Sequence, residues 1–467
     1  MTVRATDLSP ASTRLEEASL PRPARRVLFI TFHFPPSVEV GAYSCAQIAR
    51  YLPLHGWEPI VLTSTGRQYQ FVDRRVEPTA HVIRTPAFPH PLGVYRSVKS
   101  WVGRRPDGPA AGNESSGLGR PRSGLARYVL DLASIPDMYV GWLAPAIVSG
   151  LRASRRFEVR HLLSSGPCWT NHLVGLALAR LTRLPWSAHF RDPWVRAMDD
   201  ERSRSISHRI QGALERAVVT RADSVVCVTE QHTELLRHRY PQLPSAKFAT
   251  IPNGYDEAEW EGVVDGRGYQ AARFVITYAG WLYEQRTPEP VFRALRSLID
   301  RGDVDIRRLR IDLVGWCETA RGQSVKAMAA RWGLEGCLRI DGPLTKSETF
   351  RRLIGSSLLL LLAEGWALQV PAKAYEYLRA GRPILALTPT EGAIADLFRR
   401  TGGAWVIDNT DDERITAAVR EAYMGWSAGR PSRTPDPGVV AEFDRARLAR
   451  RFAAILDSKE PAMEHRA

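Results

Sequence analysis

Several features that would assign a protein to a class at once are missing from this sequence of 467 residues. The five cysteines lie far apart and form no CxxC pair, which argues against a zinc site and favours free thiols in a reducing compartment. No apolar run reaches the roughly 18–20 residues that a membrane-spanning helix needs. Residues 1–25 contain no hydrophobic core segment, so we interpret them as a disordered leader rather than a secretory signal.

Lysine is scarce, although the chain is basic. The net charge is +14, and 58 of the 64 basic residues are arginine. A charge of this size is compatible with nucleic acid, an anionic membrane surface or a phosphorylated substrate as partner. The basic residues are spread along the chain, however, without the aromatic and basic motifs of RNA-binding domains and without zinc-finger spacing. We therefore expect no nucleic-acid partner.

Buried strand patterns alternate with helical patterns in the first half of the chain. The strand patterns are RRVLFITF (25–32), EPIVLTS (58–64), EVRHLLSS (158–165), WSAHF (186–190) and DSVVCVT (223–229). Helical patterns such as 42–52 and 208–222 lie between them. This alternation is typical of a doubly wound α/β domain with a parallel sheet, which we place at residues 26–252.

One segment of this first domain breaks the pattern. Residues 102–127 are rich in Gly, Ser, Pro and Arg and contain few large apolar residues, so we expect a flexible insertion. Seven Lys/Arg against two Asp/Glu between residues 91 and 127 make it the best local candidate for contact with an anionic membrane surface. A merely solvated loop is the alternative interpretation.

A second alternation follows an Asn-Gly turn in IPNGYDEAEW (251–260). We interpret 253–272 as a linker between domains. Further strand patterns follow at 273–280, 309–315, 337–342, 357–363, 383–388 and 404–408. We therefore expect a second Rossmann-like domain at 273–438, a cleft between the two domains, and a C-terminal helix and tail at 439–467.

The phosphate-binding motifs of common nucleotide enzymes are absent. No GxGxxG follows the first strand of either domain, so we expect no dinucleotide cofactor, and no GxxxxGK[ST] motif exists. Gly280 and Gly315 do follow strands of the second domain, where glycine lets a ligand approach the main chain closely.

The stretch AEGWALQVPAKAYEYLRAGRPILAL (363–387) places a charged helix between two buried strands. Pro371 and Gly381 delimit the predicted helix, and Lys373 lies in its first turn. The helix dipole disfavours a cation there by about 0.3–1 kcal/mol. A bound anion such as a diphosphate reverses that penalty. Glu376 shares the same face, and an exposed ion pair between the two residues is the alternative.

These residues resemble the GT-B glycosyltransferases of the retaining family-4 type, from about residue 25 to residue 456. The carrying motifs are FITFHFPPSVEVGAY, HFRDPW, ADSVVCVTE, IPNGYD and VPAKAYEYLRAGRPILAL. The resemblance implies two Rossmann-like domains facing across a cleft, with the acceptor on the first and a nucleotide-sugar donor on the second. It also implies retention at the anomeric carbon without a bound metal or cofactor, and a final helix that crosses back to the first domain.

The resemblance assigns roles to particular residues. Glu376 matches the glutamate that binds the donor ribose, Arg286 the lysine that faces the diphosphate, and Gly41 a glycine near the donor phosphates. We expect Arg286, Lys373, His189 and Asp192 to act in catalysis. The donor-binding candidates are Gly41, Gly280, Trp281, Gly315, Leu344, Gln369 and Glu376. Arg191 and Trp194 are the acceptor-side candidates, and whether His189 or Arg191 contacts the acceptor stays open, because a packed strand end is an equal interpretation of His189.

Two departures from the family pattern concern the donor. Leu368 stands where a first motif glutamate contacts the donor sugar, so either the main chain of 365–368 replaces it or the donor sugar differs. Trp281 stands where an arginine is common, and Lys373 is a candidate replacement for that charge.

We expect a cytoplasmic enzyme, with peripheral association at the inner face of the membrane, that uses a UDP- or GDP-sugar. The acceptor is a saccharide, a lipid-linked molecule or a small metabolite. The alternatives are a nucleotide-sugar 2-epimerase of the same fold and a non-catalytic partner subunit.

Overall fold

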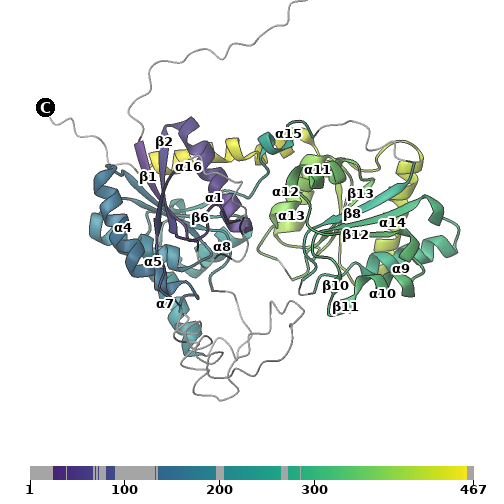
Figure 1. Cartoon of the computed structure of the whole chain (residues 1–467), viewed down its shortest axis with the longest axis horizontal. Helices are drawn as coiled ribbons and strands as arrows, with labels where there is room; N and C mark the ends of the chain where they lie inside the picture. Colours follow the sequence, from purple (N-terminus) through teal and green to yellow (C-terminus); the bar gives the residue numbers. More distant parts are fainter. Residues whose placement is uncertain are drawn as a thin grey trace, which may run out of the picture.

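A computed structural model describes residues 25–37, 39–66, 69, 72, 80–89, 132, 135–195, 205–263, 272–283, 285–365 and 367–459. Within them the chain forms two α/β domains, each built on a parallel sheet (Figure 1). The predicted leader, apart from Arg25, and the predicted basic insertion at 102–127 lie outside the described residues. None of the described helices is long and apolar enough to cross a membrane.

The first sheet has seven parallel strands in the order β3-β2-β1-β4-β5-β6-β7. The strands are β1 (Arg25–Ile30), β2 (Trp57–Ser64), β3 (His81–Thr85), β4 (His161–Gly166), β5 (Trp186–Phe190), β6 (Ser224–Cys227) and β7 (Phe248–Thr250). The helices are α1 (Val40–Tyr51), α4 (Leu143–Arg156), α5 (Thr170–Thr182), α7 (Ile206–Arg221) and α8 (Glu230–Arg239). The central strands are apolar and buried on both faces because helices cover each side of the sheet.

The second sheet has six parallel strands in the order β12-β9-β8-β13-β14-β15. The strands are β8 (Phe274–Ala279), β9 (Leu309–Val314), β12 (Leu338–Asp341), β13 (Leu358–Leu362), β14 (Ile384–Leu387) and β15 (Ala404–Ile407). The helices are α9 (Glu289–Asp300), α10 (Val325–Arg331), α11 (Lys346–Ile354), α12 (Ala372–Ala380), α13 (Ala393–Thr401) and α14 (Asp412–Ser427). The order of the strands reverses between β1 and β4 in the first sheet and between β8 and β13 in the second, so the doubly wound α/β class predicted from the sequence is confirmed.

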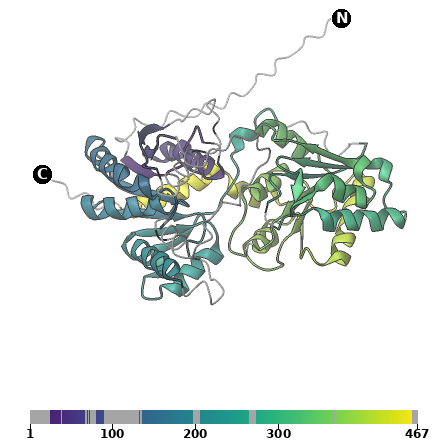
Figure 2. The same cartoon turned by 60° about the horizontal axis from the view of Figure 1, so that its bottom comes forward.

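The last helix returns to the first domain. After the short α15 (Pro437–Val440), α16 (Arg445–Asp457) packs Leu448 and Phe452 into the same core cluster as Phe29 of β1. Trp57 Nε1 donates a hydrogen bond to Asp457 at 2.8 Å. Figures 1 and 2 both show this yellow helix lying against the first domain, although it follows the second in sequence.

The helix that the sequence singled out forms between β13 and β14. It spans Ala372–Ala380, with Pro371 as the residue before it and Gly381 after it. Gly381 has φ +68, a left-handed conformation that glycine adopts without steric cost, and its N–H bonds the Leu378 carbonyl. The first turn of α12 therefore lies at the carboxyl end of β13, at the edge of the sheet where parallel α/β domains bind ligands.

Candidate functional site

A cavity of about 880 Å³ lies between the two domains. The first domain lines it with the start of α1, the segment after β4 and the residues after β5. The second domain contributes the ends of β8 and β9, the residues before α11 and the first turn of α12. The connection at Asn253–Asp256 completes the wall. The cavity thus meets the carboxyl edge of the second sheet, as expected for a ligand site.

Lys373 and Arg286 both lie next to Tyr278 of β8. Lys373 Nζ donates to the Tyr278 hydroxyl at 3.1 Å, and it lies 4.2 Å from the centre of the same ring. The Arg286 side chain is 6% exposed, and its guanidinium carbon lies 4.0 Å from the Tyr283 ring centre. Burial, together with the nearby Arg286, lowers the pKa of Lys373 to about 7. Two cations this close, one buried and one partly exposed, destabilise each other, so the arrangement favours a bound anion.

Gly280 and Gly315 are required by close approaches at this end of the sheet. A Cβ atom on Gly280 would lie 2.3 Å from Lys373 Nζ, and the residue has φ +141. A Cβ atom on Gly315 would lie 2.2 Å from the Gly280 carbonyl oxygen, and that residue has φ +110. Both positions therefore exclude larger side chains, and they leave the main chain next to the lysine.

Glu376 lies one turn after Lys373 and belongs to a second charged cluster. Lys346, the first residue of α11, places its Nζ 2.6 Å from Glu259 and 3.9 Å from Glu376. The same ammonium lies 4.7 Å from the ring centre of Tyr43, which comes from α1 of the first domain. Burial lowers the pKa of Lys346, but the two carboxylates outweigh that effect and hold it above its usual value.

On the first domain, Arg191 lies against the start of α1. Its Nε donates to the Gly166 carbonyl at 2.8 Å, and Nη2 donates to the Pro167 carbonyl at 2.9 Å. A Cβ atom on Gly41 would lie 2.7 Å from two guanidinium nitrogens. The glycine thus lets the arginine cross the helix N-terminus.

A histidine and a glutamate lie near this arginine. His33 Nδ1 lies 3.1 Å from Glu39 Oε2. Burial and the charge of Arg191 lower the pKa of His33 to about 4, so its imidazole is neutral at pH 7. A neutral imidazole can accept a hydrogen bond from a hydroxyl group.

The cavity brings together most of the residues predicted from the sequence. It is lined by Gly41, Arg191, Asp192, Gly280, Trp281, Arg286, Gly315, Leu344, Gln369, Lys373 and Glu376. Gln369 of the second domain also donates a hydrogen bond to Asp192 of the first. This bond connects the two walls of the cavity.

His189 and Trp194 do not line the cavity. His189 is 2% exposed, shares a hydrogen bond with Ser165 at 3.1 Å and packs edge-on against Phe452 of α16. Trp194 stacks on Trp169 at 5.0 Å between ring centres. The packed interpretation of His189 is therefore the one that the structure shows, and Arg191 is the member of the pair that faces the cavity.

Sequence reasoning missed several residues of the cavity wall. They include His33, Glu39, Tyr43, Asn253, Glu259, Lys346 and Arg445. The chain has only six lysines, and two of them, Lys346 and Lys373, line the cavity, so the rarity of lysine was a usable signal for Lys346. Within the described ranges, no group of three or more His, Cys, Asp or Glu side chains could hold a metal ion.

Known proteins are similar to this chain in two respects: a family model matches part of the sequence, and solved structures share the fold. Residues 102–259 match the model of Glycosyltransferase Family 4. Sucrose-phosphate synthase from Thermosynechococcus elongatus is 13% identical with a TM-score of 0.61, over 93% of this chain and 98% of that chain. WaaG, a glycosyltransferase involved in lipopolysaccharide biosynthesis, is 14% identical with a TM-score of 0.55, over 92% and 99%. No curated protein matches the sequence.

A third similar structure contains a ligand. Anabaena Alr3699/HepE, solved in complex with UDP-glucose, is 14% identical with a TM-score of 0.53, over 93% of this chain and 99% of that chain. The two facing sheets are thus the GT-B fold. The resemblance to glycosyltransferases of the family-4 type, predicted from the sequence, is confirmed.

Proposed function

We propose that this protein is a retaining glycosyltransferase that moves a sugar from a nucleotide-sugar donor to an acceptor hydroxyl. The observation that carries the proposal is the convergence of Lys373 and Arg286 on one end of the second sheet, beside Tyr278. A pair of cations in the cavity wall, next to a main chain opened by glycine, suits a diphosphate. HepE, which binds UDP-glucose, has the same fold and supports this donor class.

In this proposal the donor lies along the second domain. Its diphosphate lies between the Lys373 ammonium and the Arg286 guanidinium, against the main chain of Gly280. Glu376 accepts hydrogen bonds from the two ribose hydroxyls, for which a carboxylate is well suited. Leu344 lies in the cavity wall before α11 and is the candidate contact for the base.

The reaction breaks the bond between the anomeric carbon and the diphosphate oxygen. The acceptor oxygen forms its bond to the same carbon from the same face, and its proton passes to the departing diphosphate, so atoms and charge balance. Negative charge grows on the diphosphate as the bond breaks. Lys373 and Arg286, in the cavity wall, stabilise that charge, which is the main demand on the protein when no metal takes part.

The first domain supplies the acceptor side in this proposal. Arg191, Asp192 and the neutral His33 line that part of the cavity. We propose a saccharide, a lipid-linked molecule or a small metabolite as acceptor, and a cytoplasmic location, which the five free cysteine thiols support. Contact with an anionic membrane is proposed for residues 102–127, which lie outside the described part of the chain.

A thermal-shift panel tests the donor site. UDP, GDP and their sugar conjugates should raise the melting temperature, because a ligand that binds only the folded state stabilises it by mass action. An unchanged melting temperature with every common nucleoside diphosphate, confirmed by calorimetry, would contradict the proposal. Product analysis then separates the alternatives, because an epimerase converts its nucleotide sugar without any acceptor and a non-catalytic subunit converts none. Turnover should also survive a chelator.

A further inference from the structure

A hydrogen bond between the domains ends on the residue that replaces the expected carboxylate. Thr229 Oγ1, at the start of α8, donates to the main-chain carbonyl of Leu368 at 2.6 Å. The two residues are 139 positions apart and belong to different domains. We infer that Thr229 is a positioning residue, which holds the loop at 367–371 against the first domain and so places the first turn of α12, with Lys373, at the cavity.

Two neighbouring hydrogen bonds also connect the two domains. Gln369, the next residue of that loop, donates its side-chain amide to Asp192, which follows β5. Gln231, in the first turn of α8, donates to Asp396 of α13. We call the three contacts made by Thr229, Gln231 and Asp192 the interdomain latch. Together these contacts hold the loop and helix α13 against the carboxyl edge of the first sheet.

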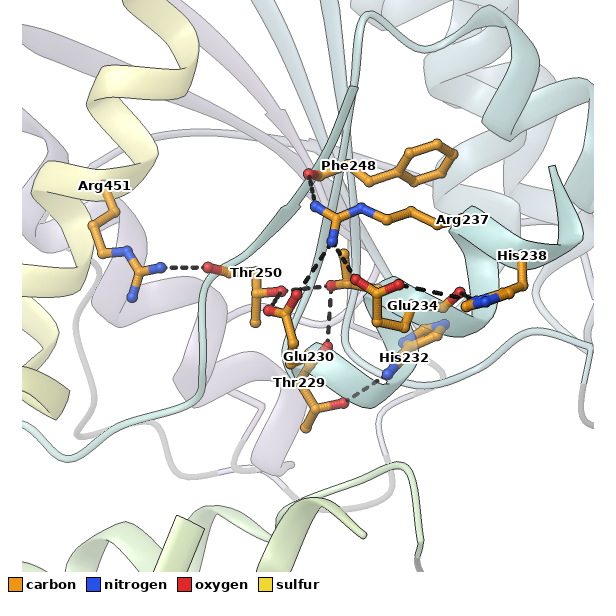
Figure 3. Close-up of polar contacts among 10 residues, drawn as sticks. Thr229, Glu230, His232, Glu234, Arg237, His238, Phe248, Thr250 and Arg451 are labelled. Atoms are coloured by element: carbon orange, nitrogen blue, oxygen red, sulfur yellow. Dashed lines mark hydrogen bonds and ion pairs between the residues drawn. The ribbon is translucent and has the colours of Figure 1, made fainter. Parts of the chain in front are cut away.

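Hydrogen bonds within the first domain fix the residues around Thr229. It is 6% exposed, and its own carbonyl accepts a hydrogen bond from Thr233 at 3.1 Å. Thr233 and Glu230 each bond the Thr250 hydroxyl at 2.6 Å, and Arg451 of α16 donates to the Thr250 carbonyl. Figure 3 shows this network around the first turn of α8. The main chain of Thr229 is therefore fixed from within the first domain, which keeps the entropic cost of its contact with the loop low.

The second domain holds the other side of the loop. The Ala393 N–H donates to the Ala367 carbonyl at 2.8 Å. Gly392, with φ +103, allows this approach, since a Cβ atom there would lie 2.6 Å from the same carbonyl oxygen. The loop then runs directly into α12, whose first turn carries Lys373. A loop fixed from both domains thus supports the helix turn that carries this lysine, and release from the first domain loosens the loop.

The effect of the latch on ligand binding depends on the fraction of molecules in which its contacts are formed. A ligand that needs both domains in place binds only the fraction of molecules in which the latch is made, so weakening the latch weakens apparent binding. This consequence for the donor rests on the proposed function, whereas the position of the loop does not.

Three substitutions separate the latch from the local role of Thr229. Its hydroxyl also caps α8 by accepting from the His232 N–H at 3.3 Å. Thr229→Ser keeps both bonds, and Thr229→Val loses both. Thr229→Asp keeps a good cap but cannot donate to Leu368 when ionised. Ser205→Ala is the matched control. It removes the cap of α7, in which the Ser205 hydroxyl accepts a hydrogen bond from the His208 N–H at 3.1 Å.

Hydrogen exchange of the full chain without ligand measures how firmly the loop is held. The Ala393 amide, which bonds the loop, should exchange about fivefold faster in Thr229→Val and Thr229→Asp, the factor expected for one net hydrogen bond. Thr229→Ser and Ser205→Ala should match the original protein. Calorimetry with UDP and GDP should show a dissociation constant raised by up to the same factor in the first two variants.

The possible outcomes are distinct. Unchanged Ala393 exchange in both Thr229→Val and Thr229→Asp overturns the inference. A change in Thr229→Val alone also overturns it, because the hydroxyl is then only a helix cap. If the original protein binds neither nucleotide, the proposed donor fails while the exchange experiment still decides the latch.

Discussion

The ammonium nitrogen of Lys373 lies 3.1 Å from the hydroxyl oxygen of Tyr278, a residue in the buried strand β8. Burial raises the pKa of this tyrosine, so its phenol remains protonated and uncharged at neutral pH. Tyr278 also donates a hydrogen bond to the Trp281 carbonyl at 2.9 Å, which orients the hydroxyl. The tyrosine thus holds the lysine at the sheet edge without neutralising its charge, which leaves that charge to act on a ligand.

Replacing Lys373 with methionine should weaken UDP or GDP binding by about tenfold to hundredfold, the range for a lost hydrogen bond to a charged group. The free variant should melt no lower than the original protein, because the lowered pKa of Lys373 shows that the fold disfavours its charge. Calorimetry and thermal unfolding measure the two effects. Lys326→Met on the exposed side of α10 is the matched control. Unweakened binding in Lys373→Met would remove this lysine from the donor site.

The affinity for a nucleoside diphosphate should fall as the pH rises above about 7. The pKa of Lys373 is about 7 in the free protein, and a bound diphosphate raises it. Below pH 7 the lysine is already charged, so this group adds no pH dependence. Above that pH, binding takes up a proton, and the dissociation constant grows by up to about tenfold per pH unit.

Calorimetry in two buffers of different ionisation enthalpy measures that proton uptake. At about pH 8 it should approach one proton for the original protein and be absent in Lys373→Met. Equal uptake in both proteins would assign the proton to another group.

Glu376→Ala should remove the preference for ribose over deoxyribose. If Glu376 accepts from both ribose hydroxyls, the original protein should bind UDP or GDP about tenfold more tightly than the 2′-deoxy form, as one good hydrogen bond to a charged group predicts. The variant should bind the two forms equally and keep its affinity for inorganic pyrophosphate. Glu335→Ala, at an exposed position outside the cavity, should leave the preference intact. A preference that survives in Glu376→Ala would place the ribose elsewhere.

Gly280→Ala should abolish binding of the nucleoside diphosphate and lower the melting temperature. The added methyl group would lie 2.3 Å from Lys373 Nζ, at a residue with φ +141. We expect a loss of about 1–3 kcal/mol in the free energy of unfolding from this strain. Gly336→Ala is the control, since nothing lies within 4 Å of its Cβ position. Normal binding by Gly280→Ala would show that the lysine can move without consequence.

The second-domain half of the site could be predicted because its signals are local. Lys373 and Glu376 follow a strand of five leucines by a fixed number of residues, and Pro371 and Gly381 mark the helix ends. The first-domain half was harder. His189 is the second-last residue of β5, two positions before Arg191, but it packs against Phe452, 263 positions later in the chain, and does not line the cavity.

Two short strands of the first sheet escaped prediction for a similar reason. β3 (His81–Thr85) is a partly exposed edge strand, and β7 (Phe248–Thr250) has three residues. Neither carries a long apolar run, so only pairing with β2 and β6 reveals them. The division into domains and linker proposed from the sequence stays a prediction at its exact boundaries.

The sequence by itself determined the parallel sheets, the place of α12 and the identity of the charges on its first turn, because periodicity and helix-end residues act within a few positions of one another. Tertiary structure alone decided three pairings: Lys373 with Tyr278, Lys346 with Glu259, and Thr229 with the Leu368 carbonyl. The members of each pair are 95, 87 and 139 positions apart. Such contacts depend on strand order and on how the two domains meet, and no local pattern encodes either.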